Sequence, residues 1–201
     1  MAASLTSTDL TLDNTSGASI PGTPSAGQTV LYPKDDKLLY YKNDAGQELP
    51  PGKVVQVVNF QTGALATGTT TIPFDDTIPQ ITEGNEYMTL AITPTNASNI
   101  LIIQVIGQWN NTQSDGNAIS TALFVGTTTD ALAATGTIGR LYAYQPPQLT
   151  HKMIAGVTTA LTFRVRAGGN SAGTTTFNGL EGTAKFGGLA ASSITITEYT
   201  P

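Results

Sequence analysis

Between residues 53 and 199, short apolar runs alternate with clusters of Gly, Pro, Asn and Thr, and no long stretch carries a helical period. Such runs, about four to eight residues long and rich in β-branched side chains, are typical of strands. Strands are predicted at 53–60, 69–74, 87–93, 99–109, 119–125, 139–144, 151–155, 160–167, 174–177 and 193–199. An Ala-rich segment at 130–135 is expected to form one short helical turn. The many short strands predict an all-β fold, an antiparallel jelly roll or β-sandwich.

Two of the predicted strands are apolar on both faces. Successive side chains of a strand point to opposite faces, yet residues 100–106 read ILIIQVI and residues 54–58 read VVQVV. In a two-sheet fold one such face fills the core, and the other needs a cover because monomers rarely expose large apolar patches. We therefore expect another copy of the chain to cover it. The residues expected at this oligomer interface are Val55, Val57, Ile100, Ile102 and Ile106.

The chain is expected to contain three segments: an extended arm at 1–27, a β-hairpin neck at 28–52 and the jelly-roll domain at 53–201. The arm is rich in small and hydroxyl side chains and cannot by itself bury enough surface to offset its ordering entropy. It either packs on its own domain or is held by a partner surface. The large apolar residues available for such anchoring are Leu5, Leu10, Leu12 and Ile20.

The composition argues against nucleic-acid and membrane partners. The net charge is −5 and the pI is near 4.6, whereas nucleic-acid binding normally requires a basic patch. The most apolar run, at 100–106, is too short to span a bilayer, and residues 1–10 lack the pattern of a signal peptide. Only 11% of the residues are charged, while 34 are threonine. Such a surface suits pleated sheets and faces that other subunits cover.

Few side chains are available for catalysis. His151 is the single histidine and cysteine is absent, so a Ser-His-Asp mechanism would need His151, and no thiolate or multi-histidine metal site can form. Four carboxylates, Asp75, Asp76, Glu83 and Glu86, have the chemistry of a glycosidase or a Ca²⁺ site. Flanking prolines and the lack of an EF-hand spacing favour a solvated loop instead. We expect no enzyme activity, no catalytic residues, no cofactor and no metal.

Aromatic residues and polar loops form a candidate recognition surface. Trp109, Tyr142 and Tyr144 either stack on a sugar or belong to a core or interface cluster. The loops at 110–117 and 167–174 are polar and Gly-rich, as recognition loops often are. The candidate receptor contacts are Trp109, Asn111 and Asn170, and the candidate ligand is a host-surface glycan.

Three stretches resemble virion proteins of tailed bacteriophages. The first, at 22–48, reads GTPSAGQTVLYPKDDKLLYYKNDAGQE and is similar to a short module near the N-termini of such proteins. The second, at 72–105, reads IPFDDTIPQITEGNEYMTLAITPTNASNILIIQV and looks like the start of a β domain of phage fibre and appendage proteins. The closing SSITITEY is also similar. The resemblance implies an N-terminal anchor, a hairpin neck and a C-terminal jelly roll that forms a TNF-like homotrimer, with no shared catalytic residues.

The resemblance further implies a structural protein on the outer surface of the virion. Its N-terminal arm would attach it to other virion proteins of the capsid or tail. A chain this short, without a long repeat or a coiled-coil shaft, favours a head decoration or head-fibre protein. The alternative is a tail-fibre or receptor-binding protein that recognises the host surface.

Overall fold

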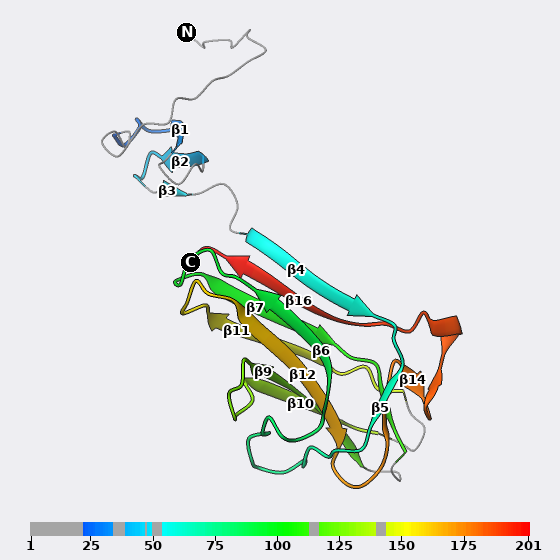
Figure 1. Cartoon of the computed structure of the whole chain (residues 1–201). Coiled ribbons are helices and arrows are strands. Elements are labelled where there is room, and N and C mark those ends of the chain that lie inside the picture. The colour runs from blue at the N-terminus through cyan, green and yellow to red at the C-terminus, as the bar shows by residue number, and fades with distance from the viewer. Residues whose placement is uncertain (1–21, 34–38, 47, 50–53, 113–116, 140–143) are drawn as a thin grey trace. The chain divides into compact units, whose positions relative to one another are not determined.

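The computed structural model describes residues 22–33, 39–46, 48–49, 54–112, 117–139 and 144–201 (Figure 1). The chain divides into two compact units, Met1–Lys53 and Val54–Pro201. The expected anchoring residues lie outside the described part of the chain, so their role stays a prediction. They are Leu5, Leu10, Leu12 and Ile20.

The first unit contains a small antiparallel sheet with the strand order β1-β2-β3. These strands are β1 (Thr29–Pro33), β2 (Leu39–Asn43) and β3 (Glu48–Leu49). A tight turn follows β2 because Asn43 accepts two hydrogen bonds, at its side-chain Oδ1 from the amide of Ala45 (3.1 Å) and at its carbonyl oxygen from the amide of Gly46 (2.9 Å). The predicted hairpin is therefore present, and β3 extends it to three strands.

The second unit is built on two four-stranded antiparallel sheets (Figure 1). One has the strand order β10-β9-β12-β6 and the other β11-β7-β16-β4. The strands are β4 (Val54–Thr62), β6 (Asn85–Ile92), β7 (Ile100–Ile106), β9 (Ala118–Val125), β10 (Ala133–Ile138), β11 (Gln148–Ile154), β12 (Leu161–Gly169) and β16 (Ser192–Tyr199). The chain passes back and forth between the sheets, so most neighbouring strands are distant in sequence, as in two Greek keys. The fold is an all-β jelly roll.

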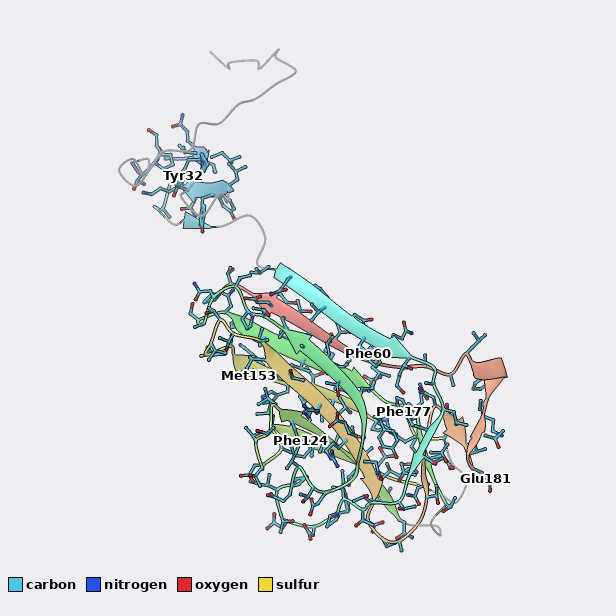
Figure 2. All side chains as sticks on the ribbon, viewed as in Figure 1. Tyr32, Phe60, Phe124, Met153, Phe177 and Glu181 are labelled. Atoms are coloured by element: carbon cyan, nitrogen blue, oxygen red, sulfur yellow. The ribbon has the colours of Figure 1, made fainter. Side chains whose placement is uncertain are left out.

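The core lies between the two sheets and follows the period-two alternation of strands. In β16, Ile194, Ile196 and Glu198 are buried, while the residues between them are half-buried. Met153 of β11, labelled in Figure 2, packs against the central cluster. The large, fully buried side chains of this cluster include Met88, Leu101, Ile103, Trp109, Ile119, Leu123, Phe163, Ile194 and Ile196.

A smaller antiparallel sheet has the strand order β5-β13-β8. Its strands are β5 (Ala66–Gly68), β8 (Trp109–Asn111) and β13 (Thr175–Phe177), and the chain continues through β14 (Gly179–Leu180), β15 (Thr183–Ala184) and the 3-10 helix η1 (Phe186–Gly188). The ring centroids of Trp109 and Phe177 lie 4.8 Å apart, and those of Trp109 and Tyr87 lie 4.9 Å apart. Such aromatic contacts stabilise a fold beyond their burial alone.

Two local predictions are wrong, and a third is not tested. The Ala-rich segment at 130–135 enters strand β10 instead of a helical turn, because pairing with β9 overrides the helical preference of alanine. Residues 69–74 form no strand and instead begin a loop that crosses the outer face of a sheet. The strand predicted at 139–144 falls mainly on residues 140–143, which lie outside the described part of the chain, so it stays a prediction.

Candidate interaction surface

The outer face of the β10-β9-β12-β6 sheet is covered by the chain itself. Residues 70–84, the covering loop, lie across it, and the amide of Ile72 donates a hydrogen bond to the carbonyl oxygen of Gly169 (3.0 Å). Ile72 packs against Ala122 and Phe124 of β9, and all three side chains are fully buried. An apolar patch on this face is thereby removed from water within one chain.

Two arginines of β12 hold the covering loop and the neighbouring β6 in place. Arg166 donates from Nε to the carbonyl oxygen of Glu83 (2.8 Å) and from Nη2 to that of Gly84 (2.7 Å). Arg164 forms an ion pair with Glu86, with 2.9 Å between Nη1 and Oε1. Because hydrogen bonds from a guanidinium are stronger than neutral ones, these contacts fix the cover over the sheet.

The outer face of the β11-β7-β16-β4 sheet lacks such a cover within the described residues of this unit. Thr197 of the central strand β16 lies opposite Val57 of β4 on one side and opposite Ile102 of β7 on the other. Ile154 is 65% exposed, Val57 56% and Ile106 41%. We call this surface the open face. It consists of Val57, Asn59, Ile100, Ile102, Gln104, Ile106, Gln148, Thr150, Lys152, Ile154, Ser193, Thr195, Thr197 and Tyr199.

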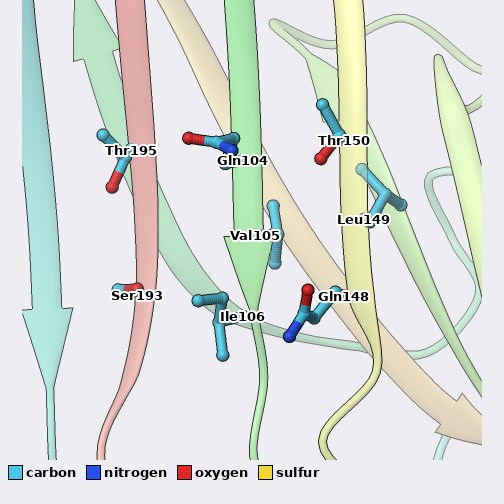
Figure 3. A pocket seen from close by; sticks show the side chains of 8 residues that line it. All are labelled: Gln104, Val105, Ile106, Gln148, Leu149, Thr150, Ser193 and Thr195. Atoms are coloured by element: carbon cyan, nitrogen blue, oxygen red, sulfur yellow. The ribbon is translucent and has the colours of Figure 1, made fainter.

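A hollow of about 110 Å³ lies at the open face and reaches the buried Val105 and Leu149. Figure 3 shows its lining side chains on the three neighbouring strands β16, β7 and β11. They are Gln104, Val105, Ile106, Gln148, Leu149, Thr150, Ser193 and Thr195. The open face combines apolar, hydroxyl and amide groups, and Lys152 is the one charged side chain among its members. Covering this surface would therefore desolvate little charge, as the core of a protein interface requires.

Most residues predicted at the oligomer interface lie together on the open face. They are Val57, Ile100, Ile102 and Ile106. Val55 differs, because the pairing of β4 with β16 shifts between Glu198 and Tyr199 and leaves Val55 as the extra residue of a β-bulge. Its side chain is 39% exposed. The structure thus gathers these residues on one surface, and their partner stays a prediction.

The predicted receptor contacts do not form a recognition surface. Trp109 has no exposed surface, so the interpretation of its ring as a receptor contact is wrong. Asn111 is only 7% exposed, and its Nδ2 donates to the hydroxyl of Thr175 (2.9 Å). Asn170 is half-buried and uses its Oδ1 to accept the amide of Ala118 (3.1 Å). These asparagines fix the ends of strands, because their side chains satisfy neighbouring polar groups.

The histidine and the acidic residues make separate contacts. His151 is half-buried on β11, and burial lowers its pKa. Glu83 accepts the amide of Gln80 at Oε2 (2.9 Å), whereas Asp75 accepts the amide of Thr77 at Oδ1 (2.9 Å). Among the described residues, no cluster of three or more His, Cys, Asp or Glu could hold a metal ion. The same part of the chain contains no helix long and apolar enough to cross a membrane.

Glu198 is a buried carboxylate that the sequence interpretation misses. Its Oε1 accepts hydrogen bonds from Nδ2 of Asn99 (2.6 Å) and from the amide and hydroxyl of Thr95 (both 2.8 Å), and its Oε2 accepts one from Nε2 of Gln56 (2.5 Å). Burial alone would raise the pKa of Glu198, but these hydrogen bonds outweigh burial and lower it. The carboxylate therefore ties the loop between β6 and β7 to β4 and β16. Its core position was visible in the period-two alternation of SSITITEY.

No protein-family model and no curated protein matches the sequence. Among solved structures, the chain is similar to the Eiger TNF of S. frugiperda, with 10% identity and a TM-score of 0.40, over 73% of this chain and 93% of that one. It is also similar to the VP2 subviral particle of infectious bursal disease virus, with 10% identity and a TM-score of 0.36, over 77% of this chain and 41% of that one. The Gt strain of this virus gives 7% identity and a TM-score of 0.33, over 81% and 44%.

The chain thus spans less than half the length of the viral proteins that it matches. The jelly-roll assignment rests on the strand order of the two sheets in this chain.

Proposed function

We propose that this protein is a structural component of the outer surface of a tailed-bacteriophage virion and assembles as a homotrimer through its open face. The open face is the observation that supports self-association. The resemblance of residues 22–48 and 72–105 to phage virion proteins supports the location. The protein acts by assembly rather than by catalysis, and head decoration is its proposed role on the particle.

The contrast between the two outer faces supports a covered open face. One sheet uses the covering loop to bury Ile72, Ala122 and Phe124, whereas the other leaves Val57 and Ile106 about half exposed. Covering each half-exposed side chain contributes about 1 kcal/mol to the free energy of association. Every copy of the chain brings the same surface, so a symmetric assembly repeats this gain at each interface.

A pair of matched lysine substitutions tests self-association. Val57→Lys places a charge on the open face, while Ile138→Lys places one on β10 of the other sheet at a similarly exposed position. Multi-angle light scattering at micromolar concentration should give a trimer for the wild type and for Ile138→Lys, and a monomer for Val57→Lys. A monomeric wild type, or a Val57→Lys variant that remains trimeric, would contradict the proposed interface.

The virion role is tested separately. Deletion of residues 1–20 should leave a folded trimer that no longer attaches to phage particles, and a truncated protein that still attaches would disprove the anchor. Micrographs of particles labelled with an antibody against this chain should show label on the head. Label on the tail would instead support the tail-fibre alternative, and unlabelled particles would overturn the virion role.

A further inference from the structure

A second hollow, of about 150 Å³, lies between the covering loop and strands β9 and β10. It is lined by Pro73, Phe74, Asp75, Thr77, Pro79, Ser120, Ala134, Thr135 and Gly136. An exposed aromatic ring, a carboxylate and several hydroxyl groups therefore meet in one depression. We call it the Phe74 hollow. The contacts described above involve single residues of this hollow and give the hollow itself no role.

The ring of Phe74 is held against the backbone of β10. A Cβ atom added to Gly136 would lie only 2.5 Å from Cε2 of Phe74, so the ring occupies the space that a side chain at this position would fill. Phe74 is still 53% exposed. One side of the ring is thus supported by the sheet while much of its surface faces solvent, which is the geometry of a stacking platform.

The carboxylate beside this ring has a fixed orientation. Asp75 accepts hydrogen bonds at Oδ1 from the amide of Thr77 (2.9 Å) and from its hydroxyl (2.6 Å). These bonds also lower the pKa of Asp75, so the group is ionised at neutral pH. Its Oδ2 accepts no hydrogen bond from the described residues. Because the side chain of Asp75 is exposed, Oδ2 faces solvent. An oriented ionised carboxylate is a strong acceptor for the hydroxyl groups of a ligand.

These groups select the chemical class of the ligand. Sites for drug-sized ligands enclose about 300–1,000 Å³, so a hollow of about 150 Å³ admits a single ring. The ionised Asp75 repels anions, while the ring of Phe74 favours an apolar face and the hydroxyls of Thr77 and Ser120 favour polar edges. A pyranose has an apolar C–H face and a rim of hydroxyl groups. From this geometry we propose that the Phe74 hollow binds one neutral hexose residue of a saccharide.

The Phe74 hollow remains accessible when the open face is covered. Ser120 and Gly136 belong to the outer face of the β10-β9-β12-β6 sheet, whereas the open face is the outer face of the other sheet. The two surfaces therefore lie on opposite sides of the sandwich. The saccharide site does not depend on the virion role, and it gives the unit a binding function in addition to assembly.

The test uses saturation-transfer difference NMR on the full-length protein. The probes are the methyl glycosides of glucose, galactose, mannose and N-acetylglucosamine at millimolar concentration, with tetramethylammonium as a cationic probe. At least one glycoside should bind, with the strongest transfer to its ring C–H protons. Phe74→Ala should weaken that binding about tenfold, and Asp75→Asn should weaken it severalfold. Phe186→Ala is the matched control, because Phe186 is 76% exposed and lies elsewhere on the unit.

Gly136→Ala provides a second variant that leaves every lining side chain in the protein. Its methyl group must displace the exposed Phe74 ring rather than backbone, so the fold should persist and hexose binding should fall. Circular dichroism and the emission of the buried Trp109 report the fold. Absence of transfer to all four glycosides, equal transfer in Phe74→Ala, or binding of tetramethylammonium alone would overturn the proposal. Trimer formation by the same samples would show that the assembly role stands independently.

Discussion

The carboxylate of Glu198 offers the sharpest test of how the jelly roll is held together. The substitution Glu198→Gln keeps the shape of the side chain and removes its charge. The amide introduced at position 198 can keep its oxygen toward Asn99 and Thr95. Its NH₂ group then faces Nε2 of Gln56, which in the wild type lies 2.5 Å from Oε2 of Glu198. Two donors would oppose each other. Rotation of the Gln56 amide would relieve the clash and break its hydrogen bond to the carbonyl oxygen of Thr93 (2.8 Å).

The expected loss of stability follows from these contacts. Hydrogen bonds to a charged group contribute about 1.5–3 kcal/mol each and neutral ones about 0.5–1.5 kcal/mol. Thr95 is exposed and Gln56 half-buried, so water can replace part of what they lose, whereas Asn99 is only 3% exposed. We expect Glu198→Gln to cost about 2 kcal/mol, and Glu198→Ala about 4 kcal/mol because it leaves buried Asn99 without its shortest acceptor.

Urea unfolding monitored by tryptophan fluorescence measures this loss. Trp109 is the single tryptophan and is fully buried, so its emission reports the unfolding of this unit directly. All samples are compared at one protomer concentration because association adds to apparent stability. Glu181→Gln, at an exposed glutamate labelled in Figure 2, is the matched control and should stay within about 0.5 kcal/mol of the wild type.

The pH dependence supplies the refuting result. Because the pKa of Glu198 is lower in the folded protein than its ordinary value of 4.5, its contribution is complete above pH 4.5 and is lost as the pH falls through the folded pKa. The lowered pKa of His151 also weakens the fold on acidification, but it acts equally in both proteins and cancels in their difference. The difference in unfolding free energy between wild type and Glu198→Gln should therefore disappear in acid. A difference that is absent at pH 7, or that is as large at pH 3 as at pH 7, would refute the argument.

Two further predictions concern other parts of the jelly roll. Arg166→Ala removes both side-chain donors to the carbonyl groups of Glu83 and Gly84. Backbone amides of the covering loop should then exchange with deuterium about tenfold faster, while those of the core strands stay protected. Unchanged exchange would show that Arg166 does not hold the loop. Burial raises the pKa of Tyr87 to about 12, so an ultraviolet titration should show a late tyrosine phase that Tyr87→Phe removes, and persistence of that phase in the variant would assign it to another residue.

The faces of the strands could be predicted because their cause is local. Alternation along 160–167 separates Phe163 and Val165 from Arg164 and Arg166 whatever the partner strands are, and the structure buries the first pair and leaves the second pair on the outer face. The doubled apolar pattern of 100–106 likewise identified a strand with one face in the core and another outside. Neither inference needs to know which strands are neighbours.

Features that depend on distant partners could not be predicted. The apolar Ile72 suggested a strand, but its neighbours Ala122 and Phe124 lie far along the chain, and only they show that the segment is a cover. The aromatic Trp109 had the chemistry of a sugar platform, yet Tyr87 and Phe177 enclose it. Phe74 is a ring that does face solvent, and its support by Gly136 is a contact between segments that no sequence pattern joins.

The two proposed surfaces have a joint consequence, because they lie on opposite sheets of one sandwich. A trimer formed through the open face carries three Phe74 hollows, so a polysaccharide with repeated hexoses can occupy several at once, and linked sites can raise apparent affinity by a factor of about 10² or more without any new contact. Val57→Lys should therefore bind a single methyl hexoside as well as the wild type does, but lose most of its retention on an immobilised polysaccharide of that hexose. Equal retention would show that the hollows act singly. Loss of monosaccharide binding as well would show that Val57 and the Phe74 hollow are coupled through the core, which the separation of the two outer faces does not predict.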